Sequence, residues 1–299
     1  MSDLHQLESS ALDPAANDAL IEAVNHQITL GTLDPSEPLL RRLVEGLGDP
    51  RGLMRLRFAE TLGEIGEVAT PVLVAALADH PNVVVRRAAA KTLTLIADPT
   101  AVPALLQAFL HDEDTVVRSS SAGALARTGE AAVPALLAIL ASPDQPEDIK
   151  GHAAWALAFI GSEASDYLYR ALDDASLDVR CAVIGALGHV AQEQPDAQAC
   201  QLLVAALRDP EPLIRTEAAA ALGQVHDPAA VPPLLEAIHD PALDVRKAAI
   251  NALGKMGDPA ALAPLQALLN AESAAEPEVV RVLAKLAVAQ IERQADADW

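Results

Sequence analysis

Aromatic residues are scarce in this chain: its 299 residues include three Phe, two Trp and two Tyr. Hydrophobic residues still make up 51% of the sequence, so alanine, leucine and valine supply most of the apolar surface. Such side chains suit close packing between helices better than packing in sheets. The scarcity of rings therefore favours a helical protein, and the length of the chain allows a large core.

Cations are also few. Lys and Arg number 21 against 42 Asp and Glu, which gives a formal net charge of −21. A surface of this charge repels phosphate backbones and anionic lipid headgroups. We therefore expect no nucleic acid partner. Residues 128–299 alone hold 25 acids against 11 bases, which would favour a basic protein partner.

Targeting segments and catalytic motifs are missing as well. Residues 1–12 are polar and acidic, unlike a signal peptide, and no apolar run approaches about eighteen residues. The two cysteines, Cys181 and Cys200, form neither a zinc-binding spacing nor a disulfide framework. No P-loop, GxGxxG turn or HExxH motif occurs. We expect a cytoplasmic protein with no membrane insertion, no metal and no tightly bound cofactor.

A repeat of 30 to 35 residues dominates what is present. The segments DPTAVPALLQ (98–107) and DPAAVPPLLE (227–236) begin alike, and a basic residue following an apolar one marks each repeat. These basic residues are Arg55, Arg86, Arg118, Lys150, Arg180, Arg215, Arg246 and Arg281. Self-similarity at such a period is typical of stacked helical or mixed units.

Each repeat predicts two helices. Asp98 and Asp227, each followed by proline, are typical of an N-cap before the first helix. Gly129, Gly161 and Gly257 mark the end of the second helix. In the seventh repeat the second helix places apolar residues at spacings 0, 3, 4, 7, 8 and 11, which form one stripe. A single pair cannot bury such a stripe, so the pairs must stack.

The predicted fold is all-α: a right-handed α-solenoid of about eight helical hairpins with an N-terminal capping helix. We expect a disordered N-terminus at 1–12, the capping helix within 13–35, the solenoid at 36–293 and a frayed C-terminus at 294–299. The eight hairpins are predicted at 36–66, 68–97, 98–129, 130–161, 162–193, 195–225, 226–257 and 258–293.

The repeat resembles HEAT repeats, specifically the short variety named for phycobilisome lyases, over about residues 36–293. In HEAT proteins the repeated arginine usually bonds an aspartate in the preceding turn. Aspartates lie six residues before the basic position in six repeats: Asp49, Asp112, Asp144, Asp174, Asp209 and Asp240. We call the eight repeated basic residues the basic column. We interpret this column as structural rather than as a binding stripe, because paired charges are poor ligands. The absence of any His-Glu dipeptide argues against the di-iron hydroxylases built on the same repeat.

In this class the second helices line the concave surface. Trp155 occupies a position there that Lys91, Ala220 and Asn251 fill in other repeats, with Gly123 and Gly185 as its counterparts in the two adjacent repeats. We interpret Trp155 as the centre of a ring-lined notch, because exposed aromatic residues often mark binding sites. The alternative is that the indole folds down over neighbouring alanines as ordinary packing.

Further candidate residues surround this position. Phe159 lies one helical turn on, with Arg127 and His189 at the equivalent places in the adjacent repeats. His152 takes a position usually held by alanine and is expected to point partly inward, and Cys181 is either a small filler or a reactive thiol. Arg87 and Lys91 form a basic spot that we expect to be unpaired and that could hold a carboxylate or phosphate; the alternative is that it only offsets the acidic surface. The roles of Tyr167 and Tyr169 stay open, since at most one of them can face the core.

Two functions follow from the resemblance. The E/F-type bilin lyases and phycobilisome-degradation factors of cyanobacteria hold an open-chain tetrapyrrole, or the phycobiliprotein carrying it, on the concave face. The resemblance implies chromophore attachment, detachment or protection, with phycocyanobilin or a related bilin as a transient ligand. Its implied partners are a phycobiliprotein subunit or a second HEAT-repeat subunit, which a lyase of this type needs for activity. The alternative is a non-catalytic scaffold or assembly factor, for example for an iron–sulfur carrier.

Overall fold

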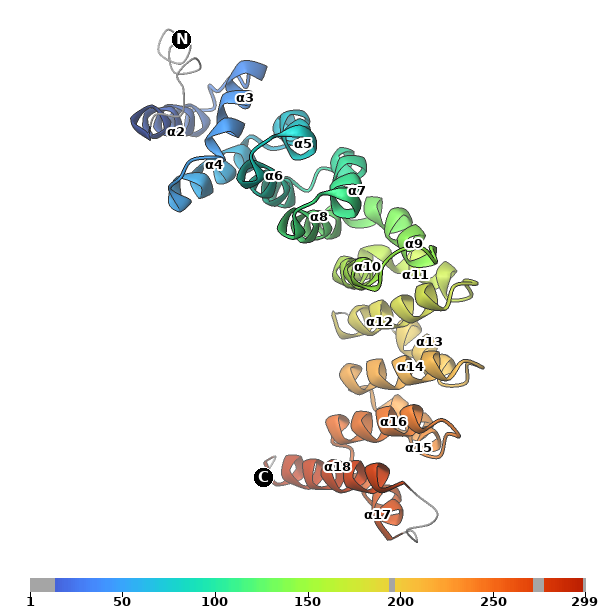
Figure 1. Cartoon of the computed structure of the whole chain (residues 1–299). Helices are drawn as coiled ribbons and strands as arrows, with labels where there is room; N and C mark the ends of the chain where they lie inside the picture. Colours follow the sequence, from blue (N-terminus) through green and yellow to red (C-terminus); the bar gives the residue numbers. More distant parts are fainter. Residues whose placement is uncertain (1–13, 194–196, 271–276, 298–299) are drawn as a thin grey trace. The chain divides into compact units, whose positions relative to one another are not determined.

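The computed structural model describes residues 14–193, 197–270 and 277–297, and within these ranges it contains helices and no strand (Figure 1). The predicted all-α solenoid is confirmed, and each of the eight predicted repeats contains two α-helices. The chain divides into two units, residues 1–136 and 137–299, with the boundary inside α9 (Val133–Ala141). The segment 1–12, for which disorder was expected, lies outside the described residues.

The first unit begins with α2 (Pro14–Thr29), which lies in the segment expected to hold a capping helix and packs on α4. Buried polar groups fix it there: the Asn17 amide donates to Asp49 Oδ2 at 2.7 Å and accepts from Arg42 at 2.6 Å. The hairpins that follow are α3 (Glu37–Gly46) with α4 (Gly52–Ile65), α5 (Thr70–Asp79) with α6 (Val83–Ile96), and α7 (Val102–His111) with α8 (Thr115–Arg127).

The second unit stacks hairpins in two layers. In Figure 1 the second helices of the repeats form one layer and the first helices form the other, and each second helix packs on the next. The second helices are α10 (Glu147–Ile160), α12 (Leu177–Glu193), α14 (Pro212–Val225), α16 (Leu243–Met256) and α18 (Glu278–Ala297). The first helices are α11 (Ser165–Ala171), α13 (Ala197–Ala206), α15 (Val231–Ala237) and α17 (Leu262–Asn270). The helix α18 continues through Ala297, into the segment 294–299 that was expected to fray.

Small residues allow the second helices to pack closely. Alanines such as Ala219 and Ala249 are fully buried in this layer. At Gly223 an added Cβ would lie 2.6 Å from the Cα of Ala252, so glycine is required for the approach of α14 to α16. The scarcity of aromatic residues follows from this geometry, because large rings do not fit between helices at such close approach.

The predicted caps are present in a modified form. Asp98 and Asp227 each accept a hydrogen bond from a backbone N–H two residues on, but they cap short 3₁₀ turns, η2 (Pro99–Ala101) and η5 (Pro228–Ala230), which then lead into the α-helix. Gly129, Gly161 and Gly257 have φ near +63° to +71°, which permits the chain to leave the second helix as predicted.

The basic column bonds in a different direction from the expected one. Arg215 donates to the backbone carbonyl of Asp209, six residues earlier, at 2.8 Å, while its guanidinium binds both carboxylate oxygens of Asp240 in the next repeat at 2.7 and 2.9 Å. Arg86 likewise binds Asp112, and Arg180 binds Asp209. The prediction of a structural column is correct, but these carboxylates belong to the following repeat, so the ion pairs connect consecutive hairpins.

One described stretch, Gly52–Asp79, is by length and composition apolar enough to span a membrane, and 44% of its most apolar 18-residue segment is buried. No such run was expected from the sequence. In the structure this stretch folds back at Gly66 into α4, η1 (Gly66–Ala69) and α5, and its apolar residues Phe58, Leu62 and Leu73 are fully buried in the core. Its hydropathy is therefore explained by packing inside the first unit.

Candidate functional site

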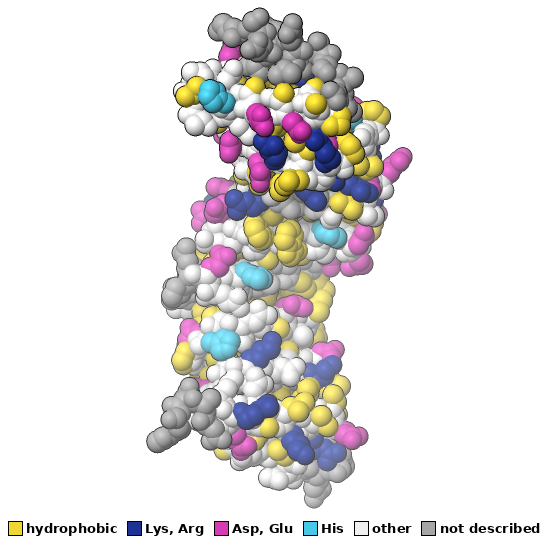
Figure 2. Space-filling model, turned by 90° about the vertical axis from the view of Figure 1, so that its left-hand side faces the viewer, with side chains coloured by type: hydrophobic (Ala, Val, Ile, Leu, Met, Phe, Trp, Pro, Cys, Tyr) yellow, Lys and Arg dark blue, Asp and Glu magenta, His cyan; other side chains and the backbone are white. Residues whose placement is uncertain are grey.

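Two aromatic side chains stand exposed on the second-helix layer of the second unit. Trp155 and Phe159, one turn apart on α10, are 52% and 50% exposed. Their ring centroids are 5.5 Å apart and the planes are tilted by 34°. The exposure of Trp155 agrees with the sequence prediction and contradicts the alternative in which the indole seals the core. Figure 2 faces this layer and shows hydrophobic side chains at its surface among polar ones.

The glycine at the equivalent position of α12 leaves space, as predicted. A Cβ built on Gly185 would meet no atom of the described residues within 4 Å, and the same holds for Gly151 on α10 and Gly123 on α8. Glycine inside a helix costs about 1 kcal/mol relative to alanine. At these three positions no packing contact requires glycine, whereas at Gly223 the close approach of α16 does.

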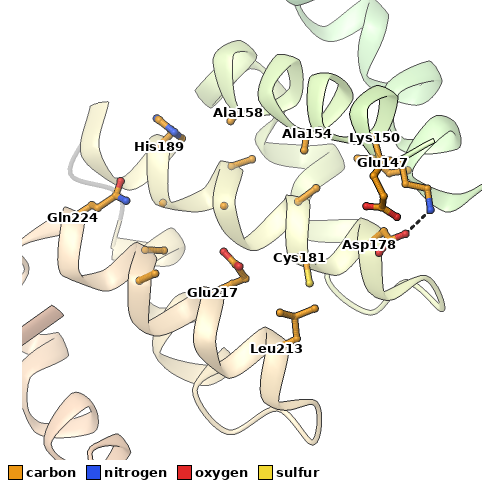
Figure 3. Close-up of a pocket in the computed structure, with 18 residues that line it drawn as sticks. Glu147, Lys150, Ala154, Ala158, Asp178, Cys181, His189, Leu213, Glu217 and Gln224 are labelled. Carbon is orange, nitrogen blue, oxygen red and sulfur yellow. Dashed lines mark hydrogen bonds and ion pairs between the residues drawn. The ribbon is translucent and has the colours of Figure 1, made fainter. Parts of the chain in front are cut away.

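A groove runs across α10, α12 and α14, with a volume of about 440 Å³ (Figure 3). Its floor consists of small residues, namely Gly151, Ala154, Ala158, Ala182, Gly185, Ala186, Gly188, Ala220 and Ala221. Ala154 and Ala158 each directly precede one of the two exposed rings in the sequence, but Trp155 and Phe159 themselves are not among the residues that line the groove. The volume falls within the range typical of small-molecule sites.

Charged residues line the groove unevenly. Lys150 Nζ contacts Asp178 Oδ2 at 2.5 Å, so this cation is already neutralised. Glu147 is exposed at the same end. Glu217, on α14, is half-buried and makes no hydrogen bond or ion pair with any residue that the structure describes. Burial raises the pKa of its carboxyl. The lining therefore carries an excess of negative charge.

Cys181 lines the groove, where its side chain and that of Leu213 point toward each other (Figure 3). Burial, together with the nearby carboxylates of Glu217 and Asp178, raises the pKa of the Cys181 thiol to about 11. The thiol is therefore protonated at neutral pH, whereas nucleophilic cysteines need the thiolate. Of the two roles that the sequence left open for Cys181, the raised pKa favours a small lining residue over a reactive thiol. Cys200 is buried, and burial with Asp227 raises its pKa to about 12.

The two candidate histidines differ in position. His189 is exposed and lies with Gln224 at the end of the groove opposite the Lys150–Asp178 pair (Figure 3). His152 does not point inward as expected: its side chain is exposed, and Nδ1 lies 2.7 Å from the carbonyl oxygen of Asp148. It does not line the groove, because this bond to the preceding turn directs the ring along its own helix.

The predicted basic spot lies in the first unit, in a separate groove of about 520 Å³ over α4, α6 and α8. The expectation that Arg87 is unpaired is wrong: its guanidinium binds both oxygens of Asp114 at 2.9 and 2.5 Å, and this bond lowers the pKa of Asp114. Lys91 is exposed and makes no ion pair within the described part of the chain. The exposed apolar side chains of Leu56 and Leu95 line the same groove.

Arg127 is exposed at the end of α8, in the first unit, and lines neither of these grooves.

Tyr167 and Tyr169 are both partly exposed on α11, and neither is buried in the core. The Arg170 guanidinium lies 6.0 Å from the centroid of the Tyr167 ring. The structure therefore brings together Cys181 and His189 in the groove, with Trp155 and Phe159 on one of the helices that form it, whereas Arg87 and Lys91 belong to the first unit.

Sequence reasoning missed Glu217. In the repeat alignment it stands at the position filled by Ala88, Ala182 and Ala248, the same position at which His152 was noticed. A carboxylate replacing alanine on a half-buried face was the available signal. Among the residues described, no group of three or more His, Cys, Asp or Glu lies close enough to hold a metal ion.

These stacked hairpins define a HEAT-repeat protein. The sequence pattern of HEAT repeats matches residues 37–126, 70–158, 133–222 and 200–284, so the chain belongs to the HEAT-repeat family. The bilin biosynthesis protein MpeU of Synechococcus sp. (strain WH8020) is 43% identical over 209 residues, which cover 70% of each chain. The resemblance to the phycobilisome-lyase group of HEAT-repeat proteins is thereby confirmed.

Solved structures agree on the fold. A crystal structure of Kap121p has a TM-score of 0.59 at 14% identity, covering 97% of this chain and 37% of that one. The complex of CpcE and CpcF of phycocyanin lyase from Nostoc sp. PCC7120 has a TM-score of 0.35 at 20% identity, covering 84% of this chain and 94% of that chain. The first likeness shows the solenoid fold alone, and the second is a distant one.

Proposed function

We propose that the protein binds a bilin, free or carried by a phycobiliprotein, in the groove over α10, α12 and α14. The observation that supports this most directly is the exposed ring pair Trp155–Phe159 on α10, the helix that also contributes Gly151, Ala154 and Ala158 to the groove. A flat conjugated ligand can stack on such rings and enter a groove that larger side chains would close. The relationship to a bilin biosynthesis protein supports the same ligand class.

Binding in this groove would contribute orientation rather than covalent chemistry. The raised pKa of the Cys181 thiol, about 11, makes it a poor nucleophile at neutral pH. Holding a bilin in one pose beside a partner protein lowers the barrier to its transfer through proximity. The attachment or removal of the chromophore would therefore depend on groups of a partner, either a phycobiliprotein subunit or a second HEAT-repeat subunit.

The test uses phycocyanobilin and the two tryptophans of the chain. In a Trp299→Phe background, Trp155 is the single tryptophan, so quenching of its fluorescence reports binding beside α10. We expect quenching together with a red-shifted, sharper absorption band of the bilin. Trp155→Ala in the natural background should weaken binding about tenfold, a typical loss for an exposed aromatic contact.

Leu286→Ala is the matched control, because Leu286 is a similarly exposed apolar residue of the second-helix layer, on α18. It should leave binding unchanged. If the wild-type protein changes neither the absorption of phycocyanobilin nor its own fluorescence, the proposed function is wrong.

A second candidate function, docking of a partner protein, rests on the first unit. Leu56, Leu95 and Val116 are exposed around the groove that also contains Lys91. Exposed apolar side chains beside an unpaired cation suit a partner with an apolar, acidic surface. Substitution of Leu56 and Leu95 by serine should then abolish binding of a phycobiliprotein subunit while leaving binding of the free bilin intact, as measured by calorimetry with each ligand.

A further inference from the structure

The charge of the groove restricts how a tetrapyrrole can enter it. Of the residues that line it, Glu147, Asp178 and Glu217 are acidic, and the one lysine, Lys150, is held by Asp178 at 2.5 Å. A bilin carries two propionates on one edge and pyrrole nitrogens on the other. The propionates would be repelled by this lining, whereas N–H groups would be attracted to it.

Glu217 is the group placed to accept such donors. Figure 3 shows its carboxylate pointing from α14 toward α12, between Cys181 at one end and Gln224 at the other. It is half-buried, and no residue that the structure describes donates a hydrogen bond to it or pairs with it. The carboxylate is partly desolvated by its surroundings and open to the groove, so a hydrogen-bond donor that enters the groove can reach and stabilise it.

Resting on the proposed function, we propose that Glu217 recognises the pyrrole N–H edge of the bilin and holds the bound chromophore in its protonated, cationic form. The carboxylate accepts hydrogen bonds from neighbouring ring nitrogens, and its negative charge stabilises the additional proton on the conjugated system. The propionates then point out of the groove, toward solvent or a partner protein.

This orientation changes the role expected for the basic residues of the chain. Arg87 is already paired with Asp114, and Arg87 and Lys91 belong to the first unit. They are not needed to bind the propionates if these groups leave the groove. Recognition of the ligand then depends on one stacking edge, at Trp155 and Phe159, and one polar edge, at Glu217.

The test compares Glu217→Gln with Glu236→Gln. Both substitutions remove one negative charge from the second unit, but Glu236 is 72% exposed on α15 and does not line the groove. For phycocyanobilin we expect Glu217→Gln to weaken binding about tenfold, the usual effect of losing a charged hydrogen bond. The pH at which the bound chromophore loses its protonated absorption band should also fall. Glu236→Gln should leave both quantities close to those of the wild type.

A second ligand tests the orientation. The dimethyl ester of phycocyanobilin has no propionate charge and should bind the wild-type protein at least as tightly as the free acid. Equal behaviour of the two variants, or failure of the ester to bind while the acid binds, would overturn the role of Glu217 but leave bilin binding intact. No binding of the acid at all would overturn the proposed function and this inference with it.

Discussion

Trp155 and Glu217 both depart from the residues that the repeat holds at their positions in the adjacent hairpins. The counterparts of Trp155 there are Gly123 and Gly185, and those of Glu217 are Ala182 and Ala248. Each departure has a cost: an exposed indole on α10, and a half-buried carboxylate without a partner on α14. Residues that reduce stability without packing in return are characteristic of binding sites.

The cost of Glu217 should be measurable in the unliganded protein. Burial raises its pKa, so the ionised form is less stable in the folded than in the unfolded state. The sign follows from linkage: this penalty is absent below the unfolded pKa, about 4.3, and complete above the folded pKa. We expect Glu217→Gln to raise the Tm by roughly 1–3 °C at pH 8 and to leave it unchanged at pH 4.

Glu236→Gln is the control in the same thermal unfolding experiment. Its carboxylate is 72% exposed and lies 3.4 Å from Arg208, a surface pair that contributes little. An equal rise in Tm for both variants at pH 8 would mean that general charge repulsion, rather than burial at Glu217, causes the effect.

At the scale of the helix, the glycines of the second-helix layer serve two purposes. Gly223 permits close approach, since a Cβ there would lie 2.6 Å from backbone of α16. Gly185 faces open space and lines the groove. The sequence marks both as glycines inside helices and does not distinguish them, because the difference lies in what the neighbouring helix presents.

The two glycines predict opposite effects of the same substitution. Gly223→Ala should lower the free energy of unfolding by about 2 kcal/mol, because the backbone of α16 must move. Gly185→Ala should raise it by up to about 1 kcal/mol, because alanine is the better helix former and meets no atom. Urea unfolding followed by circular dichroism measures both. Destabilisation by Gly185→Ala would show that the open space beside α12 is not there.

At the scale of the whole molecule, ion pairs between consecutive repeats recur in both units. Arg86 binds Asp112 in the first unit, and Arg215 binds Asp240 in the second. In a repeat protein the stability depends on such interfaces between neighbouring hairpins as well as on each hairpin alone. Because the carboxylates are partly buried and bonded at both oxygens, these pairs differ from ordinary surface ion pairs.

Acid should therefore destabilise the fold. Hydrogen bonds from Arg51 lower the pKa of Asp49, and hydrogen bonds from Arg87 lower that of Asp114. At Asp240 burial alone would raise the pKa, but the bonds from Arg215 and the backbone outweigh it and the net direction is down. A carboxyl with a lowered folded pKa stabilises fully above the unfolded value, about 3.9, and this contribution is lost as the pH falls below it.

We expect the free energy of unfolding, measured by urea titration, to be nearly constant from pH 5 to 7 and to fall steeply below about pH 4. Asp240→Asn keeps an oxygen that can accept from the Ala242 N–H but loses the charge that pairs with Arg215. It should be less stable than the wild type at pH 7, and the difference should shrink toward pH 3. A constant difference across this range would exclude the ion pair as its cause.

The sequence by itself determined the architecture. Helix pairs, their limits near Asp-Pro and glycine, the stacking of eight repeats and the exposure of Trp155 all follow from local chemistry repeated many times. Repetition makes such signals dependable, because each repeat tests the same spacing again. The basic column was also correctly identified as structural, since its spacing is the same whichever carboxylate it binds.

The tertiary structure alone decided which residues meet across repeats. It showed that the carboxylates paired with Arg86, Arg180 and Arg215 come from the following hairpin, that Arg87 is paired, and that Glu217 is not. Pairing depends on the offset between adjacent helices and on side-chain direction, neither of which the one-dimensional spacing of a repeat contains. Contacts between helices therefore decide which charged groups of the groove are paired and which stay available to a ligand, although each of these residues can be read in the sequence.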